Sequence, residues 1–216
     1  VWADDFRTLK LKLGRDLSFE AQRLFELESS VSAFRLRFDF NGTQASPVLR
    51  SFFAALPISI RNAIEFVEDP MLWNFEAWRE LRESTGVELA LDRVSDEELQ
   101  QIDFANPSFG WIVIKPAIQD PFEMIELAKS ESTRLCVTSY LDHPVGQMGA
   151  ALEAARLSTH SGSRVGTTGL LSQKAFEPNE FSEAMNVKGS KLLFDPNEPG
   201  IGFGSLLERC QWRPLR

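Results

Sequence analysis

The sequence predicts an α/β protein folded as a (β/α) barrel, on three observations. Short β-rich runs alternate with longer amphipathic runs as far as residue 168, the pattern of parallel strands joined by helices. Seven strands and six intervening helices fit this alternation, which favours a closed barrel over an open sheet. The 216 residues fall somewhat short of the roughly 250 that an eight-stranded barrel uses. Together these observations predict a TIM-type barrel.

Each element follows from a local signal. The strands are predicted at 6–14, 34–40, 64–67, 87–91, 111–114, 135–139 and, for a short last strand, 164–168. The first helix is predicted to open near Asp16, a good N-cap residue, and the second follows the turn Asn41-Gly42-Thr43 and contains residues 48–53. The remaining helices are predicted at 75–83, 95–101, 121–129 and 145–157, where apolar residues recur at helical spacing.

Composition excludes several classes of protein. Hydrophobic residues make up 43% and charged residues 25%, typical of a globular protein, and no run approaches the ~20 apolar residues of a membrane helix. The net charge of −8 has the wrong sign for a protein that neutralises phosphates, so we expect no nucleic-acid partner and no membrane. Cys136 and Cys210 form no disulfide framework, which favours a reducing compartment such as the cytoplasm.

The two ends of the chain do not fit the repeat. The chain starts with Val1, and one strand–helix unit is expected before it, so that residues 1–169 form a barrel that is incomplete at its N-terminus. Residues 170–216 break the alternation with several prolines and a glycine cluster. We expect this C-terminal segment to pack on the barrel or against a further domain.

Charged side chains interrupt the strands where they end. Lys10 and Lys12 share one strand face while leucines occupy the other, and Lys115 follows an apolar run that offers it no partner. Acidic residues close the next three strands at Asp39, Glu68 and Asp92. Alone, each of these could be a solvated edge or a turn residue. Because catalytic groups sit at the carboxyl ends of barrel strands, all are expected at one mouth. Three carboxylates there suit Mg²⁺, and lysines beside the ion suit proton abstraction next to a carboxylate.

The motifs that carry these residues resemble a known family. They are Lys10-Leu-Lys12, Arg37-Phe-Asp39-Phe-Asn41, Val67-Glu68-Asp69-Pro70, Leu91-Asp92 and Ile114-Lys115-Pro116. Their order, and the 23 to 29 residues between successive ligand or lysine positions, resemble the strand ends of the enolase superfamily, muconate-lactonising subgroup. The resemblance covers residues 6–169 and implies a (β/α)7β barrel whose first strand and N-terminal α+β capping domain are absent from this chain.

Two further strand ends narrow the resemblance. Residues 112–117 and 137–142, followed by Gly146, resemble those of the o-succinylbenzoate synthases, a dehydratase family of menaquinone biosynthesis. That resemblance implies a Mg²⁺-dependent lyase, with Mn²⁺ as an alternative ion, that dehydrates 2-succinyl-6-hydroxy-2,4-cyclohexadiene-1-carboxylate through an enediolate. The implied roles are Lys12 as general base, Lys115 as its electrostatic partner across the intermediate, Lys10 as an aid to Lys12, Asp39, Glu68 and Asp92 as metal ligands, Asn41 and Arg37 as supports, and Ser139 as a seat for a substrate carboxylate.

Departures from the family pattern leave other functions open. Arg93 follows Asp92 where the family has an acidic residue, and the capping domain that closes the site is missing. The alternatives are an N-acylamino acid racemase or a muconate cycloisomerase of the same subgroup, or a degenerate barrel that binds a ligand without catalysis. A dipeptide epimerase fits less well because residues 164–169 lack the Asp-x-Asp motif of that group. The substrate is expected to be a small carboxylate, and the oligomeric state, monomer or homo-oligomer, stays open.

Overall fold

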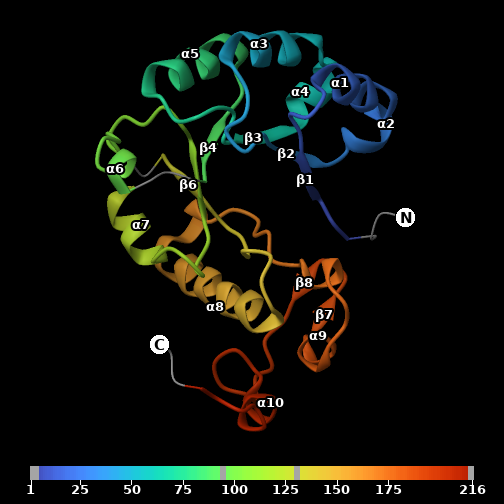
Figure 1. The fold of residues 1–216 in the computed structure, drawn as a ribbon, viewed down its shortest axis with the longest axis vertical. Coiled ribbons are helices and arrows are strands. Elements are labelled where there is room, and N and C mark those ends of the chain that lie inside the picture. The colour runs from blue at the N-terminus through green and yellow to red at the C-terminus, as the bar shows by residue number, and fades with distance from the viewer. Residues whose placement is uncertain (1–4, 93–95, 129–131, 214–216) are drawn as a thin grey trace.

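The computed structural model describes residues 5–92, 96–128 and 132–213 (Figure 1). Its centre is a parallel sheet of six strands that pair in sequence order. The strands are β1 (Thr8–Lys12), β2 (Arg35–Asp39), β3 (Ile64–Glu68), β4 (Leu89–Leu91), β5 (Trp111–Ile114) and β6 (Arg134–Val137). A parallel sheet in which every successive strand pair is joined through helix fits the predicted α/β barrel, with β1 and β6 as the two edges of the sheet among the described residues. The absence of a first strand and cap from the chain stays a prediction.

Eight α-helices of the described part alternate with these strands. They are α1 (Leu17–Glu26), α2 (Glu28–Val31), α3 (Ser46–Ala55), α4 (Ile58–Ala63), α5 (Phe75–Thr85), α6 (Asp96–Leu99), α7 (Pro121–Leu127) and α8 (Pro144–Ser161). Side-chain caps begin the main ones, since Asp16 accepts from the Phe19 amide and Asn74 from the Ala77 amide. Gly86, at a φ of 70°, ends α5 in the left-handed conformation that glycine adopts without strain. The short α2 and α4 lack the long periodic pattern that sequence prediction needs.

Side chains alternate between the two faces of the sheet. Leu36, Phe38 and Phe40 of β2 point outward, where Phe52 and Phe53 of α3 cover them in the main core. A smaller cluster fills the inside of the curved sheet and consists of Phe66, Ala90, Trp111, Val113 and Cys136. The polar residues of the same inward face therefore lie above this cluster, toward the carboxyl ends of the strands.

The expectation of a seventh strand at 164–168 is wrong for the described residues. That segment makes only isolated parallel bridges to β6, at Leu135 with Val165 and at Thr138 with Gly169. Between the bridges the Thr167 carbonyl accepts from the Arg37 side chain at 2.8 Å instead of joining a ladder. Gly166 lies against the Trp111 ring, where a Cβ would come within 2.7 Å of ring carbons. A buried guanidinium and a close ring contact thus interrupt the regular pairing.

The C-terminal segment packs on α8. It contains the 3-10 helix η2 (Gln173–Ala175), α9 (Glu180–Ala184), the hairpin β7 (Val187–Lys188) and β8 (Lys191–Leu192), and α10 (Gly204–Glu208), and it follows the 3-10 helix η1 (Gly162–Arg164). Met148 of α8 forms a separate apolar cluster with Phe181, Met185 and Phe203. The division into a barrel of residues 1–169 and a segment of 170–216 remains a prediction. Of the helices that the structure describes, none has the length and apolar character to cross a membrane.

Candidate active site

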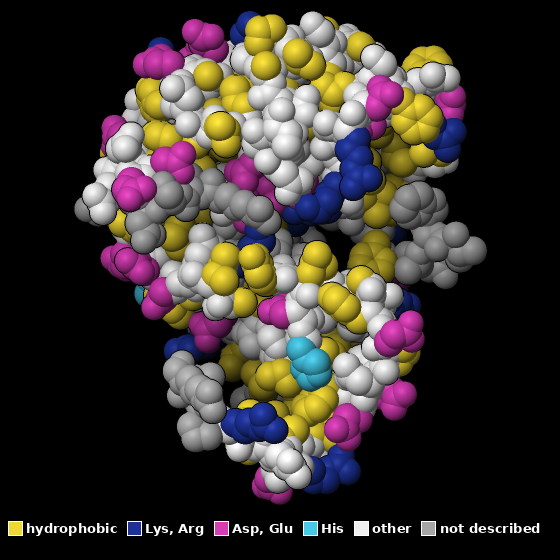
Figure 2. Space-filling model, in the orientation of Figure 1, with side chains coloured by type: hydrophobic (Ala, Val, Ile, Leu, Met, Phe, Trp, Pro, Cys, Tyr) yellow, Lys and Arg dark blue, Asp and Glu magenta, His cyan; other side chains and the backbone are white. Residues whose placement is uncertain are grey.

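A large cavity opens at the carboxyl ends of the strands. Its volume is about 1080 Å³, and Figure 2 shows basic and acidic side chains beside each other at the upper edge of the hollow in the middle of the molecule. All nine residues that the sequence analysis singled out line this cavity, namely Lys10, Lys12, Arg37, Asp39, Asn41, Glu68, Asp92, Lys115 and Ser139. The parallel sheet therefore brings together residues that are more than one hundred positions apart in the sequence.

Lys10 and Lys12 of β1 reach toward the acidic residues that end β2 and β3. Lys10 Nζ lies 2.9 Å from Asp39 Oδ2 and 2.7 Å from Glu68 Oε1, so one ammonium group bridges two carboxylates. Lys12 Nζ lies 3.4 Å from Asp39 Oδ2 and 3.3 Å from Asn41 Oδ1, yet its side chain remains 65% exposed. Lys10 is thus bound within the cluster, whereas Lys12 borders the open cavity.

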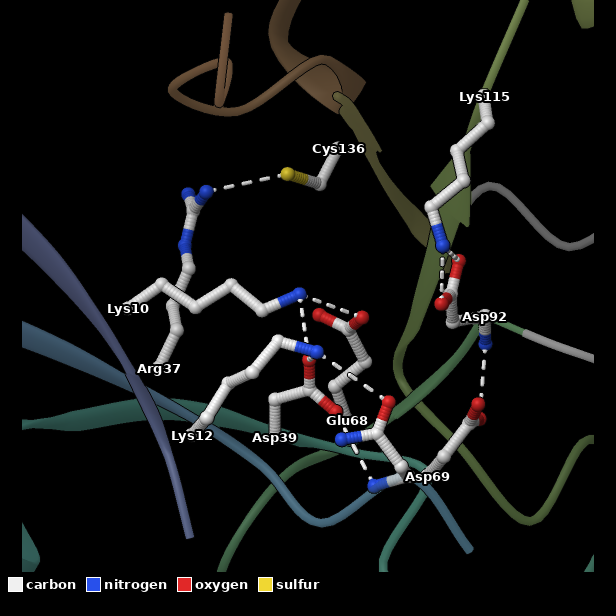
Figure 3. A network of polar contacts seen from close by, with 10 residues as sticks. Lys10, Lys12, Arg37, Asp39, Glu68, Asp69, Asp92, Lys115 and Cys136 are labelled. Carbon is white, nitrogen blue, oxygen red and sulfur yellow. Dashed lines mark hydrogen bonds and ion pairs between the residues drawn. The ribbon is translucent and has the colours of Figure 1, made fainter. Parts of the chain in front are cut away.

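Lys115 approaches from the opposite side (Figure 3). Its ammonium group contacts both carboxylate oxygens of Asp92, and both side chains are almost completely buried. The sequence offered Lys115 no local partner, and the parallel pairing of β4 with β5 supplies one 23 positions earlier. The carboxylates consequently lie between Lys115 on one side and the pair of Lys10 and Lys12 on the other (Figure 3).

The charges of this cluster determine which lysine stays protonated. Burial opposes the charge of Lys10, but the carboxylates of Glu68 and Asp39 outweigh it and raise the pKa of Lys10 above its ordinary value. Burial likewise acts to raise the pKa of Asp39, and the Lys10 charge reverses this and lowers it. Lys10 and Asp39 therefore form a stable ion pair, which makes Lys10 a poor proton acceptor.

The surroundings of Glu68 disfavour its ionised form, in contrast to those of Asp39. Burial raises its pKa to about 8 against the pull of Lys10, and the charges of Asp92 and Asp39 add to the rise. Burial is thus the main cause of the rise, and the charges of the two neighbouring carboxylates are smaller causes. Such crowding of carboxylates is relieved by a cation, and oxygen ligands of this kind suit a hard divalent ion.

The carboxylates are nevertheless paired with lysines rather than grouped for a metal. Among residues 5–92, 96–128 and 132–213, no three His, Cys, Asp or Glu side chains are arranged so that they could hold a metal ion together. The donor set fits a divalent cation by its chemistry, and Lys10 and Lys115 supply the positive charge in the arrangement seen. Arg93, which follows Asp92, lies outside the described residues.

Arg37 points away from the acidic cluster into the barrel. Its guanidinium donates to Glu65 Oε2 at 2.6 Å, contacts Cys136 Sγ at 3.1 Å and donates to the Thr167 carbonyl at 2.8 Å, and it lies over the Phe66 ring. Arg37 and Asp39 share a strand face, but the Arg37 side chain points toward Cys136 and away from Asp39 (Figure 3). Burial raises the pKa of Cys136 to about 11, so its thiol stays protonated.

Asn41 and Ser139 occupy the rim of the cavity. Asn41 adopts a positive φ of 52°, and its amide donates to Asp39 Oδ1 at 3.1 Å. Asn41 therefore contacts both Lys12 and Asp39, the two residues that the sequence analysis assigned to base and metal ligand. Ser139 Oγ lies 3.0 Å from Ser172 Oγ, which joins the end of β6 to the C-terminal segment.

Three further residues border the site without having been singled out from the sequence. Cys136 lies inward on β6 beside Arg37, and Thr138, two positions on, has a buried hydroxyl without a hydrogen-bond partner among the described residues. Asp69 is buried directly after Glu68. The period-two alternation along β6 could have indicated the first two. Asp69 stands in the motif Val67-Glu68-Asp69-Pro70, in which only Glu68 was assigned a role.

Comparison with known proteins finds a similar sequence. The chain is 34% identical over 213 residues to an o-succinylbenzoate synthase of Bdellovibrio bacteriovorus, and the match covers 99% of this chain and 63% of that protein. The likeness to an o-succinylbenzoate synthase therefore extends over almost the whole chain. This chain thus spans less than two thirds of the curated relative that it matches. No family model matches the sequence.

Solved structures share the fold of this chain. An L-Ala-D/L-Glu epimerase of Bacillus subtilis superposes with a TM-score of 0.71 at 21% identity, over 92% of this chain and 55% of that one. A muconate cycloisomerase variant gives 0.68 at 15% identity, over 91% and 55%. A dipeptide epimerase of Cytophaga hutchinsonii, in complex with Mg and a dipeptide, gives 0.65 at 18% identity, over 81% and 47%. These likenesses concern the fold.

Proposed function

We propose that this chain is the barrel part of an o-succinylbenzoate synthase, a Mg²⁺-dependent dehydratase. The observation that carries the proposal is the 34% identity to such a synthase over almost the whole chain. The cavity supports it, because three lysines and three carboxylates from five neighbouring strands line one opening. The substrate would be the 2-succinyl-6-hydroxycyclohexadiene carboxylate, which loses water to give o-succinylbenzoate.

The lysines divide the work by their surroundings. Lys10 is held by Asp39 and Glu68 and keeps its proton, so it contributes positive charge. Lys12 is the lysine whose side chain is exposed to the cavity, and it would accept the proton α to the substrate carboxylate. Lys115 lies across the cavity with its ammonium group buried and would stabilise the negative charge that develops on the substrate.

The acidic residues would hold the metal ion. Asp39, Glu68 and Asp92 end three successive strands and offer only oxygen ligands, which Mg²⁺ prefers. When bound, the ion acts as a Lewis acid that polarises the substrate carboxylate and makes its α-proton more acidic. For the residues themselves this requires that Lys10 and Lys115 give up part of their contact with the carboxylates, because both now occupy ligand oxygens.

The remaining polar residues would orient these groups. The side-chain oxygen of Asn41 accepts from Lys12, and its main-chain amide donates to Asp39. Asn41 would therefore fix the distance between base and ligand. Ser139 would offer its hydroxyl to a second carboxylate of the substrate from the far side of the cavity. Arg37 would act indirectly, since its guanidinium is fully engaged inside the barrel.

A metal-dependent dehydration assay on the full-length protein tests the proposal. The loss of diene absorbance should require Mg²⁺, and Lys12→Ala should lower kcat by about 10²- to 10⁴-fold, the usual contribution of a general base. The folded stability should change little, because the Lys12 side chain is 65% exposed. Solvent deuterium exchange at the α-carbon serves as the second readout.

Other outcomes point to other functions. Exchange that needs both Lys12 and Lys115 would favour a racemase, which uses a base on each face of its substrate. Turnover of a lactone in place of the diene would favour a cycloisomerase. A folded protein that neither turns over substrate nor gains thermal stability from Mg²⁺, and in which Asp39→Asn changes nothing, would favour a non-catalytic barrel.

A further inference from the structure

Asp69 is a buried acidic residue that the proposed chemistry does not use. It follows Glu68 directly at the end of β3, and only 6% of its surface is exposed. Its φ of 40° lies in the left-handed region, which residues other than glycine, asparagine and aspartate rarely adopt. Strained backbone of this kind persists where the surrounding structure holds it, and it gathers at functional sites.

Three hydrogen bonds join Asp69 to the two neighbouring strand ends. Its Oδ1 accepts from the Asp92 amide at 3.0 Å, and its own amide donates to the Ala90 carbonyl at 3.1 Å. Its carbonyl accepts from the Gly42 amide at 2.7 Å. Asp69 therefore connects the exits of β2, β3 and β4, the three strands that carry Asp39, Glu68 and Asp92 (Figure 3).

The bond to Asp92 falls where the sheet itself ends. The Cα pairing of β3 with β4 stops at Glu68 and Ala90, so Asp92 lies two residues beyond the last pair. The next described residue after Asp92 is 96. The short Asp69 side chain accepts a hydrogen bond from the Asp92 main-chain amide, beyond the last backbone pair of the sheet. It thereby fixes the main chain at the residue that carries the Asp92 carboxylate.

We propose that Asp69 is a positioning residue that fixes the strand end carrying Asp92 against the ends of β2 and β3, so that Asp92 can join Asp39 and Glu68 around a divalent cation when one binds. The inference rests on the proposed function, since the cation belongs to it. What Asp69 contributes is an acceptor oxygen for the Asp92 amide and a left-handed turn that presents its carbonyl to Gly42. Residues that orient metal ligands in this way commonly change metal affinity by 10- to 100-fold when they are lost.

Two substitutions at position 69, both of which keep the left-handed turn, test the acceptor oxygen. Asp69→Asn keeps the acceptor oxygen and tolerates the positive φ, so it should bind Mg²⁺ like the wild type. Asp69→Gly removes the acceptor and relieves the strained turn, so the protein should fold but bind Mg²⁺ at least about tenfold more weakly. Calorimetric titration with Mg²⁺ alone measures the affinity, and amide hydrogen exchange at Asp92 measures the local bond.

Asn74→Ala provides a matched control. Asn74 accepts a bond of the same length, 3.0 Å, from a main-chain amide, but it caps α5 outside the cavity. It should lower the melting temperature without changing the Mg²⁺ affinity. Loss of affinity in this control equal to that in Asp69→Gly would show that the effect is general destabilisation and would overturn the inference.

The remaining outcomes also decide between explanations. Equal Mg²⁺ affinity in Asp69→Gly and the wild type, or equal protection of the Asp92 amide, overturns the inference while the proposed function stands. If the wild type binds no Mg²⁺, the proposed function fails instead. Protection of the Asp92 amide that is retained in Asp69→Asn and lost in Asp69→Gly would then still support the holding role of Asp69.

Discussion

Two charged networks share the inner face of the sheet and differ in how completely they are satisfied. The interior network joins Arg37 to Glu65, Cys136 and the Thr167 carbonyl, with the guanidinium stacked on Phe66. The mouth network consists of Lys10, Lys12, Lys115, Asp39, Glu68 and Asp92 and borders a cavity of about 1080 Å³. Although both networks line the cavity, the cation of the first is 5% exposed and bonded to three protein groups, whereas in the second burial raises the pKa of Glu68 to about 8.

The difference teaches how to separate a structural network from a functional one. Both are buried and both pair opposite charges, so burial alone does not distinguish them. Two residues that adjoin the mouth network, Asn41 and Asp69, have a positive φ, and the network contains a carboxyl whose pKa rises to about 8. Strained backbone gathers where a site must accept a ligand. Burial also raises the pKa of Cys136 in the interior network, but none of its four members has a positive φ.

Loss of the interior cation should have the largest effect on stability. Arg37→Met leaves Glu65 buried and without its closest cationic partner. The free energy of unfolding should therefore fall by about 3–5 kcal/mol. Urea denaturation measures this. Arg35→Met is the control, because Arg35 is 65% exposed and lies 3.4 Å from Glu65, so it should cost at most about 1 kcal/mol. Equal effects of the two would mean that the interior network is not the stabilising one.

The mouth network should respond to pH and to Mg²⁺ instead. Burial raises the pKa values of Glu68 to about 8 and Asp69 to about 7, above their unfolded values of 4.5 and 3.8. Groups raised in this way favour the folded state fully below the unfolded pKa, and that contribution is lost as pH rises through the folded pKa. The metal-free protein should therefore lose stability as pH rises toward 8.

Mg²⁺ should restore that stability where the carboxylates are ionised. At a concentration 100 times its dissociation constant the ion should contribute about 2.7 kcal/mol. Melting curves with and without Mg²⁺ should thus diverge more at about pH 8.5 than at about pH 6. Glu68→Gln should flatten the pH dependence of the metal-free protein. A Mg²⁺ effect that is the same at both pH values would contradict this account of the mouth network.

The smallest effect is expected at the rim. Ser139→Ala removes one hydroxyl, and the loss of a single neutral hydrogen bond, about 1 kcal/mol, should raise KM roughly fivefold with kcat unchanged. Ser172→Ala is the matched control, since it removes the other half of the Ser139 pair and leaves the Ser139 hydroxyl in the cavity. If both variants raise KM equally, Ser139 serves to anchor the C-terminal segment and not to bind substrate.

Sequence reasoning succeeded where the pattern is local or repeats with the strands. The two-residue alternation on β1 and β2 predicts that the leucines and phenylalanines face outward and the polar residues inward, and the structure has this arrangement. The capping residue Asp16 marked the start of the first helix. The prediction of a seventh strand was wrong. Arg37 contacts Thr167 from 130 positions away in the sequence, and such a contact cannot be recognised in the local residue pattern.

The sequence by itself determined the strand order, the inward faces and the one mouth at which lysines and carboxylates meet, because parallel strands place their carboxyl ends together. Only the tertiary structure decided which of these charges pair. Lys10 bridges Asp39 and Glu68, Lys115 binds Asp92, and Arg37 turns away into the barrel. Periodicity specifies the face of a strand from which a side chain leaves, but a long side chain reaches several ångströms, and its partner is set by burial and by the neighbouring charges.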